Sequence, residues 1–224
     1  MRQMAKTPPP VKSKPTGRIE LIDGSGRRKY LTSEERERFH DAARKQTPEV
    51  MTFCLFLYWT GFRISEALDM LRSRVDFESK AVIIETLKKR RKGIFRQVPL
   101  PEKFLSELDL VHRLKKPRRG ETRKDWKLWE WSRRTATRRV EEVMQAAAIE
   151  GLQASAKGVR HAYAIECLQK GIPLNLVSKW LGHASLTTTA IYADALERKN
   201  APSPRGYGDR LLVPKRGKKL PNAE

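Results

Sequence analysis

The chain has 224 residues, with 47 Lys and Arg against 26 Asp and Glu, a formal net charge of +21 and a pI of about 10.3. That length suffices for one domain with tails, and the positive excess predicts a polyanionic partner such as nucleic acid. Two cysteines, Cys54 and Cys167, and four histidines without ligand spacing predict neither a disulfide framework nor a metal site. The longest apolar run, residues 50–59, is too short to span a bilayer, so we expect no membrane anchor and a cytoplasmic, nucleoid-associated protein.

The N-terminal part predicts a basic arm followed by helices. Residues 1–29 are basic and rich in proline and are expected to be a flexible arm. The capping-box spacing from Thr32 to Glu35 predicts the start of a helix, and Pro48 opens a second, strongly apolar one. Gly61 can end that helix in a left-handed cap before a short helix that carries Glu66. Packed helices are therefore expected to position Arg63.

The middle of the chain predicts a small antiparallel sheet. Residues 75–77, 80–85 and 94–100 are expected to be strands, with Ile94, Arg96 and Val98 alternating along the third, and the basic run 88–93 as a turn. A helix from Pro101 through Leu114 and a polar loop to about residue 127 follow. Residues 88–139 hold 19 basic and 6 acidic side chains, which makes this stretch the most basic part of the chain.

The C-terminal part predicts helices over residues 135–149, 158–170 and 173–181, the last ended by Gly182, with Tyr192 near a short helix beyond them. Residues 193–200 are compatible with a helix, and residues 201–224 form a basic tail broken by proline and glycine. Trp126, Trp129 and Trp131 lie among basic residues and could stack on bases, but packing of the last two near the core is favoured. The fold class is α+β, mostly helical, with a small antiparallel β-sheet.

The chemistry centres on Arg160, His183 and Tyr192, with Tyr192 nine residues after His183. A phenol has a pKa of about 10, so a tyrosine that attacks phosphorus needs cations fixed on the phosphate. Arginine suits this role because its planar fork binds two phosphate oxygens and keeps its proton. Arg63 and Lys88 are further cations placed upstream.

Three segments in this order resemble the tyrosine recombinase (phage integrase) family, whose signature is Arg, Lys, His-x-x-Arg, His and Tyr. They are Thr60-Gly61-Phe62-Arg63-Ile64-Ser65-Glu66-Ala67-Leu68, Lys157-Gly158-Val159-Arg160-His161-Ala162-Tyr163-Ala164, and Leu181-Gly182-His183-Ala184-Ser185 through Ile191-Tyr192. Three ordered boxes carry far more weight than any one alone. The resemblance runs from about residue 30 to about residue 196 and implies a catalytic domain over residues 30–200.

The resemblance implies that double-stranded DNA is cleaved and rejoined through a 3′-phosphotyrosyl intermediate on Tyr192, without a cofactor. Arg63 and Arg160 would hold the non-bridging oxygens, His183 and Lys157 would donate to the phosphate or adjust the proton of the tyrosine, and Lys88 would protonate the leaving 5′-oxygen. Cations would then do the work that a metal does in many nucleases.

Several assignments stay open at this level. Lys157 stands where most family members carry the histidine of His-x-x-Arg, and a lysine can donate to phosphate but would not shuttle protons near neutral pH. Lys89 and Lys92 compete with Lys88 for the role of the hairpin lysine. His161 could take part directly or only support the fold, and support is favoured. Glu66 is expected to orient a cation.

The family usually carries a separate N-terminal clamp domain, and 29 residues are too few for one. The chain therefore resembles the compact recombinases of the fimbrial-switch kind, or a fragment of a longer enzyme, and the basic arm is expected to contact phosphates. The resemblance also implies a homotetramer on paired DNA sites, with possible DNA-bending accessory proteins. A non-catalytic helix-turn-helix regulator built on residues 173–192 and a type IB-like topoisomerase are the alternatives.

Overall fold

The computed structural model describes residues 20–85, 93, 95–116, 126–183 and 185–200, with the side chains of residues 194–200 left aside. The expected hairpin run 88–92, which includes Lys88, Lys89 and Lys92, lies outside the described residues. So do most of the expected arm and the C-terminal tail. Among the described residues, no helix is long and apolar enough to cross a membrane.

The N-terminal helices follow the local signals in the sequence. Helix α1 (Ser33–Arg44) begins at Thr32, whose side chain accepts from the Glu35 amide while the Glu35 carboxylate accepts from the Thr32 amide. Helix α2 (Pro48–Thr60) has proline at its first turn and ends at Gly61, which adopts φ 62°. Helix α3 (Ile64–Leu68) follows immediately, so two packed helices fix the chain on both sides of Arg63.

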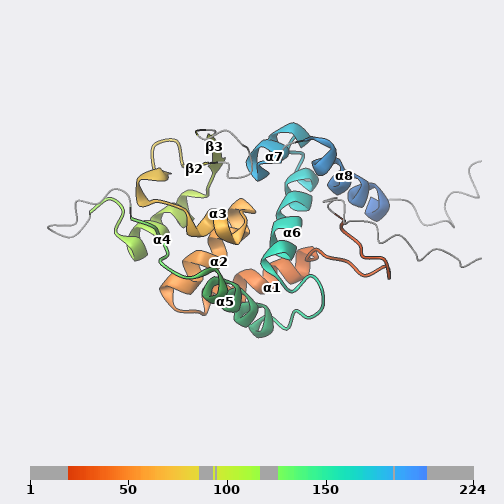
Figure 1. Cartoon of the computed structure of the whole chain (residues 1–224), viewed down its shortest axis with the longest axis horizontal. Coiled ribbons are helices and arrows are strands. Elements are labelled where there is room, and N and C mark those ends of the chain that lie inside the picture. The colour runs from red at the N-terminus through yellow and green to blue at the C-terminus, as the bar shows by residue number, and fades with distance from the viewer. Residues whose placement is uncertain (1–19, 86–92, 94, 117–125, 184, 201–224) are drawn as a thin grey trace, which may run out of the picture.

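A three-stranded antiparallel sheet lies beside these helices (Figure 1). A 3₁₀ turn, η1 (Arg72–Arg74), leads into β1 (Val75–Asp76), which pairs with β2 (Ala81–Glu85), and β2 pairs with β3 (Phe95–Pro99) in the register Ile84 to Arg96. The three strands confirm the expected sheet and are slightly shorter than predicted. In β3 the side chains of Arg96 and Val98 are buried, so an arginine occupies the inner face of a strand.

The remaining helices complete a mostly helical domain. They are α4 (Glu102–His112), α5 (Arg133–Ala146), α6 (Ala156–Gln169), α7 (Leu174–Leu181) and α8 (Thr187–Asn200). One prediction was wrong here: Tyr192 does not precede or flank a short helix but lies inside the 14-residue helix α8. In Figure 1, α6 runs between the α1–α3 region and the α7–α8 pair.

Two hydrophobic clusters hold these elements together. The larger is built around α2, where the ring of Trp129 contacts the rings of Phe53 and Phe56 at centroid distances of 5.2 and 5.1 Å. Core packing of Trp129 is thereby confirmed, while Trp126 lies under the guanidinium of Arg72. The smaller cluster joins α6, α7 and α8 and contains both Tyr192 and Leu21, so the chain just before Tyr30 packs against the part of the domain that carries the tyrosine.

Candidate active site

Arg63 is held at the junction of α2 and α3 by a carboxylate one turn later. Its backbone amide donates to Oε2 of Glu66 at 3.0 Å, and its Nη1 donates to Oε1 of the same residue at 2.8 Å. The side chain of Arg63 is 31% exposed, whereas that of Glu66 is 3% exposed. The guanidinium therefore keeps an open side toward solvent while its inner side is fixed.

Within the described part of the chain, Glu66 is the carboxylate that pairs with three arginines. Arg96 Nη2 lies 2.9 Å from Glu66 Oε2, and Arg160 Nη1 lies 3.7 Å from the same oxygen. Burial raises the pKa of Glu66, but Arg96, Arg160 and Arg63 outweigh burial and bring the pKa below its usual value. One negative charge thus faces three positive ones, and the cluster retains a net positive charge that suits an anion.

Arg160 lies on α6 and hydrogen bonds to the backbone at the end of α2 and at the end of α7. Its Nη1 donates to the carbonyl of Gly61 and its Nη2 to the carbonyl of Leu181, each at 2.7 Å. Burial and the neighbouring Arg63 lower its pKa to about 10, so the guanidinium stays charged at neutral pH. These two bonds use two of its five N–H groups.

His183 follows the left-handed cap of α7, where Gly182 adopts φ 64°. Its Nδ1 lies 2.8 Å from the hydroxyl oxygen of Thr189, and its ring stacks on that of Tyr192 with a centroid distance of 6.2 Å and an interplanar angle of 10°. Burial, then Arg160 and Arg63, lowers the pKa of His183 to about 3. The imidazole is therefore neutral at physiological pH, and among the described residues its Nε2 has no hydrogen-bond partner.

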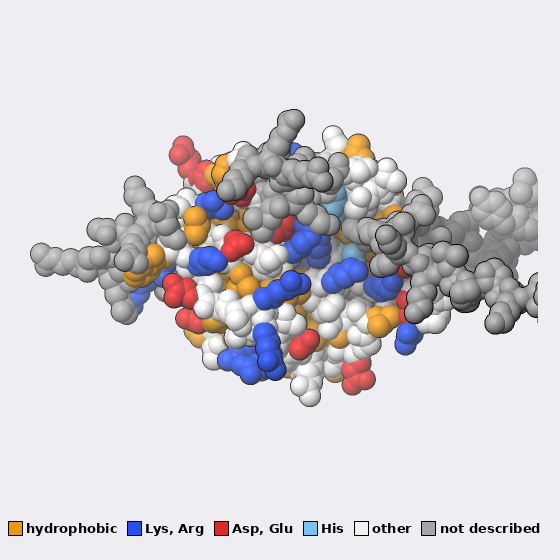
Figure 2. All heavy atoms as spheres, in the orientation of Figure 1, with side chains coloured by type: hydrophobic (Ala, Val, Ile, Leu, Met, Phe, Trp, Pro, Cys, Tyr) orange, Lys and Arg blue, Asp and Glu red, His pale blue; other side chains and the backbone are white. Residues whose placement is uncertain are grey.

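Tyr192 is fully buried among these groups. Burial raises the pKa of its phenol to about 12, and Arg160 and Arg63 act in the opposite direction. The two arginines thus lie close enough to favour the phenolate. The structure brings together Arg63, Arg160, His183 and Tyr192, four of the six residues expected from the sequence. In Figure 2 Lys and Arg side chains, with histidine beside them, lie across the face that α3 and α6 occupy in Figure 1.

The other two expected residues are not placed in this cluster. Lys88 lies outside the described residues. Lys157 is exposed on the first turn of α6, which Ser155 caps, and it makes no hydrogen bond to Tyr192. Its charge still acts on the site, since it contributes to lowering the pKa of His161.

Two residues contribute more than the sequence indicated. His161 Nδ1 lies 2.8 Å from the Tyr192 hydroxyl, so the imidazole next to Arg160 contacts the hydroxyl of the candidate nucleophile rather than only filling the core. Arg96 is almost fully buried, and its Nε donates to the carbonyl of Trp180 at 2.8 Å. Its alternation with Val98 on β3 was the available signal, because a charged residue on the inner face of a strand needs a buried partner.

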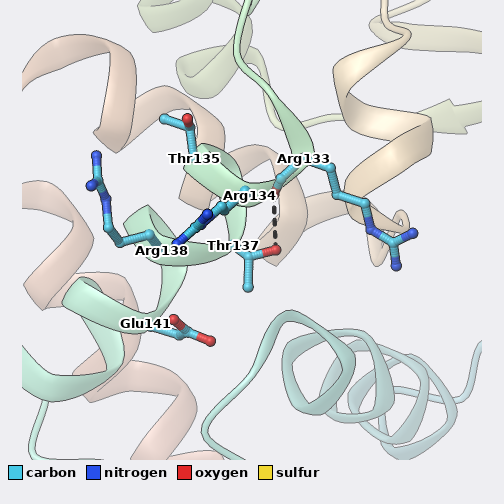
Figure 3. Close-up of a pocket in the computed structure, with 6 residues that line it drawn as sticks. All are labelled: Arg133, Arg134, Thr135, Thr137, Arg138 and Glu141. Atoms are coloured by element: carbon cyan, nitrogen blue, oxygen red, sulfur yellow. Dashed lines mark hydrogen bonds between the residues drawn. The ribbon is translucent and has the colours of Figure 1, made fainter.

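A second basic surface lies on α5, away from Tyr192. Its first turns line a hollow of about 620 Å³ with the side chains of Arg133, Arg134, Thr135, Thr137, Arg138 and Glu141. Figure 3 shows the three arginines projecting from the helix, with the Thr137 hydroxyl turned back to the Arg133 carbonyl. Within the described part of the chain, Arg133 and Arg134 form no ion pair, whereas Arg138 lies 3.6 Å from Glu142. Two unpaired guanidinium groups therefore face solvent here.

No metal site accompanies either surface within the described ranges, where no three His, Cys, Asp or Glu side chains are grouped to hold an ion. Cys54 and Cys167 are both buried free thiols. The described side chains around Tyr192 include arginine and histidine.

Comparison with known proteins agrees with this arrangement. The family model described as "Phage integrase family" matches residues 29–199, which is most of the chain. The chain belongs to the phage integrase family. Among curated integrase relatives, the tyrosine recombinase XerA of Pyrococcus furiosus is 28% identical over 189 residues, covering 77% of this chain and 62% of that protein. The tyrosine recombinase XerD of Brucella abortus is 27% identical over 198 residues, covering 85% and 62%.

This integrase-family chain thus spans about 62% of the length of these two relatives. Solved structures have the same fold. The crystal structure of XerA recombinase aligns with a TM-score of 0.62 at 23% identity, covering 77% of this chain and 65% of that one. The post-cleavage complex of XerH site-specific recombinase with palindromic difH substrate aligns with a TM-score of 0.59 at 25% identity, covering 76% and 52%.

Proposed function

We propose that the chain is a site-specific DNA recombinase that cleaves and rejoins DNA through a 3′-phosphotyrosyl intermediate. The observation that carries the proposal is that Arg63, Arg160 and His183 gather around Tyr192: both arginines favour its phenolate, and the His183 ring stacks on its ring. These groups come from the junction of α2 and α3, from α6 and from the turn after α7, and a buried phenol surrounded by cations has little structural purpose of its own. Family membership supports the same reaction class.

In the proposed reaction, the Tyr192 oxygen attacks the scissile phosphorus and the bond to the 5′-oxygen breaks. Arg63 offers its open side to one non-bridging oxygen, and Arg160 offers the N–H groups that its two carbonyl bonds leave unused. When Thr189 donates to Nδ1 of His183, Nε2 carries the imidazole proton and can donate to a phosphate oxygen. Removing one such donor typically lowers the rate ~10²-fold to 10³-fold.

The remaining two expected residues complete the proposal. Lys88 supplies the proton for the leaving 5′-oxygen, and exposed Lys157 donates to the DNA backbone. The released 5′-hydroxyl attacks the phosphotyrosine of a partner strand, so bond energy is conserved and no nucleotide cofactor is consumed. By the same resemblance, four chains act together on paired DNA sites, with or without accessory proteins that bend the DNA.

The α5 surface suits the proposed substrate. Arg133 and Arg134 can neutralise backbone phosphates, and arginines at the start of a helix can also reach base edges in the major groove. Among the described residues, no carboxylate forms an ion pair with either guanidinium group, and this supports a role in binding phosphates.

One observation favours a second candidate, the non-catalytic DNA-binding regulator. Tyr192 is fully buried with its hydroxyl hydrogen bonded, as a core tyrosine would be, and α7, Gly182 and α8 form two helices joined by a turn. A regulator, however, has no need for the cluster of Arg63, Glu66 and Arg160 near Tyr192.

A trapping experiment separates the two candidates. Duplexes nicked near the cleavage position lose the 5′-hydroxyl fragment by diffusion, so a phosphotyrosyl complex accumulates. Fragments of the DNA that flanks the gene serve as substrates, and wild type is compared with Tyr192→Phe on denaturing gels. A covalent band that requires Tyr192 supports the recombinase, whereas tight binding of these fragments without any band supports the regulator.

A further inference from the structure

Replacement of the signature histidine by Lys157 leaves the proton of Tyr192 without an evident acceptor. Lys157 is exposed, and an ammonium near neutral pH has no lone pair to offer. The hydrogen bond that the Tyr192 hydroxyl does make is to Nδ1 of His161, at 2.8 Å. This contact lies on the atom that must lose its proton.

We propose that His161, and not Lys157, accepts the proton of Tyr192 during DNA cleavage; this rests on the proposed function. As the Tyr192 oxygen bonds to phosphorus, its proton passes to Nδ1 of His161. The bond from phosphorus to the 5′-oxygen breaks with its electron pair, and that oxygen takes a proton from a separate acid, for which Lys88 is the candidate. In rejoining, the imidazolium returns its proton to the tyrosine.

The position of His161 suits this task. It directly follows Arg160 on α6, and successive side chains on a helix project about 100° apart. Arg160 consequently points to the carbonyls of Gly61 and Leu181, while His161 points to α8 and Tyr192. One helix would therefore bind the phosphate with one residue and deprotonate the nucleophile with the next.

The environment of His161 keeps its imidazole neutral, which is the form that can accept a proton. The side chain is buried, and burial, then Lys157 and Arg160, lowers its pKa to about 3, so the imidazole is neutral at physiological pH. A base this weak cannot ionise the phenol in advance. Proton transfer is expected to accompany attack, when the phenol becomes acidic and the bound phosphate offsets the charges of Lys157 and Arg160.

The competing explanation is that the same hydrogen bond only holds Tyr192 in a resting position. The two explanations differ in what His161→Asn does. An asparagine oxygen can still accept a hydrogen bond near the position of Nδ1, but it cannot take up a proton at neutral pH. If His161 only holds Tyr192 in a resting position, His161→Asn should cleave DNA at an unchanged or higher rate. If His161 accepts the proton, the variant should cleave DNA more slowly.

The test measures single-turnover formation of the covalent complex at saturating protein, on nicked duplexes with either oxygen or sulfur at the 5′-bridging position. A thiolate leaves without being protonated. The sulfur substrate should therefore restore the cleavage rate of a variant that lacks the general acid, but not the rate of a variant that cannot deprotonate the nucleophile. His161→Asn is expected to form the complex ~10²-fold to 10⁴-fold more slowly on both substrates. Lys88→Ala, the matched control, is expected to recover on the sulfur substrate.

Lys157→Ala keeps the test decisive should His161→Asn fail to fold, because Lys157 is exposed. Because Lys157 is proposed to donate to the DNA backbone, its loss is expected to weaken DNA binding, and at saturating protein the complex is expected to form less than ~10²-fold more slowly. A loss of 10²-fold or more that sulfur does not relieve would assign the proton to Lys157 and overturn the proposal. Equal rates for wild type and His161→Asn would also overturn it. A wild type that forms no complex would instead overturn the proposed function, and this step with it.

Discussion

Arg96 and Glu66 form a buried ion pair in which Nη2 lies 2.9 Å from Oε2 and both side chains are 3% exposed. Arg96 also donates to the carbonyl of Trp180 in the last turn of α7. The strand β3, the Arg63 junction and the turn that carries His183 are thus connected through one guanidinium. Arg96 therefore positions groups on both sides of the site without reaching the hydroxyl of Tyr192 itself.

Glu66→Gln is expected to destabilise the protein strongly. The substitution keeps the shape of the side chain but leaves Arg63, Arg96 and Arg160 without a neutralising charge. Breaking a buried pair by removing one partner costs about 3–5 kcal/mol of unfolding free energy. Urea denaturation measures this loss. Glu102→Gln, which removes the exposed partner of Lys80, is the control and should leave the unfolding midpoint nearly unchanged. Similar midpoints for the two variants would contradict the central role of Glu66.

Gly182→Ala is expected to cost more stability than Gly171→Ala, although both glycines have positive φ. A Cβ on Gly182, at φ 64°, would lie 2.8 Å from Arg96 Nη1, whereas a Cβ on Gly171, at φ 76°, has no atom within 4 Å. Both variants carry the left-handed strain of about 1–2 kcal/mol. Only Gly182→Ala must also displace Arg96. If urea denaturation shows equal losses of unfolding free energy for the two variants, Arg96 can move aside without an energetic penalty.

The free energy of unfolding is expected to fall as the pH falls below about 6.5. Burial is the main cause that lowers the pKa of His112 to about 4 and those of His161 and His183 to about 3, from 6.5 in the unfolded chain. Below 6.5 the unfolded chain binds protons that the folded protein excludes, so this stabilisation is complete above 6.5 and is lost progressively toward pH 3 to 4. Each histidine contributes at most about 2 kcal/mol of that loss between pH 6.5 and 5.

Chemical denaturation at pH 7.5 and pH 5 tests this dependence. His112→Gln removes one of these three histidines from a site distant in sequence from the boxes, where Thr52 is its hydrogen-bond partner. The variant should lose less stability between the two pH values than wild type does. An unchanged difference in His112→Gln would indicate that His112 becomes protonated in the folded protein.

Arg133→Ala combined with Arg134→Ala is expected to weaken DNA binding through backbone electrostatics. Each lost phosphate contact should flatten the slope of log affinity against log salt by about 0.9, so the double variant should lose about 1.8. Fluorescence anisotropy between 50 and 200 mM salt, approximately the range in which such slopes are read, provides the measurement. Lys80→Ala, whose charge is paired with Glu102, should keep the wild-type slope. Equal slopes for all three proteins would show that Arg133 and Arg134 on α5 do not contact the DNA backbone.

Local signals in the sequence account for much of the fold. The capping box at Thr32, proline at the start of α2 and the left-handed Gly61 each predict an element boundary that the structure confirms. The start of α8 was missed because the run from Thr187 to Thr189 is β-branched and weakens the helical signal. That helix begins at Thr187, whose amide donates to the hydroxyl of Ser185.

Site residues that belong to a motif with fixed spacing could be predicted from the sequence. Site residues that are placed only by contacts between distant elements could not. Arg63, Arg160, His183 and Tyr192 could be selected from ordered boxes. The partners of Arg96 come from α3 and α7, 30 and 84 residues away, and no local pattern joins them. Likewise, contact between His161 and Tyr192 depends on how α6 packs on α8, which the sequence leaves open.

The measurement that most directly tests the role of Tyr192 is peptide mapping of the trapped protein-DNA complex. After digestion of protein and DNA, mass spectrometry should place a nucleotide linked through its 3′-phosphate on the peptide that contains Tyr192, and the released fragment should carry a 5′-hydroxyl. Attachment at any other residue, or linkage through a 5′-phosphate, would contradict the account.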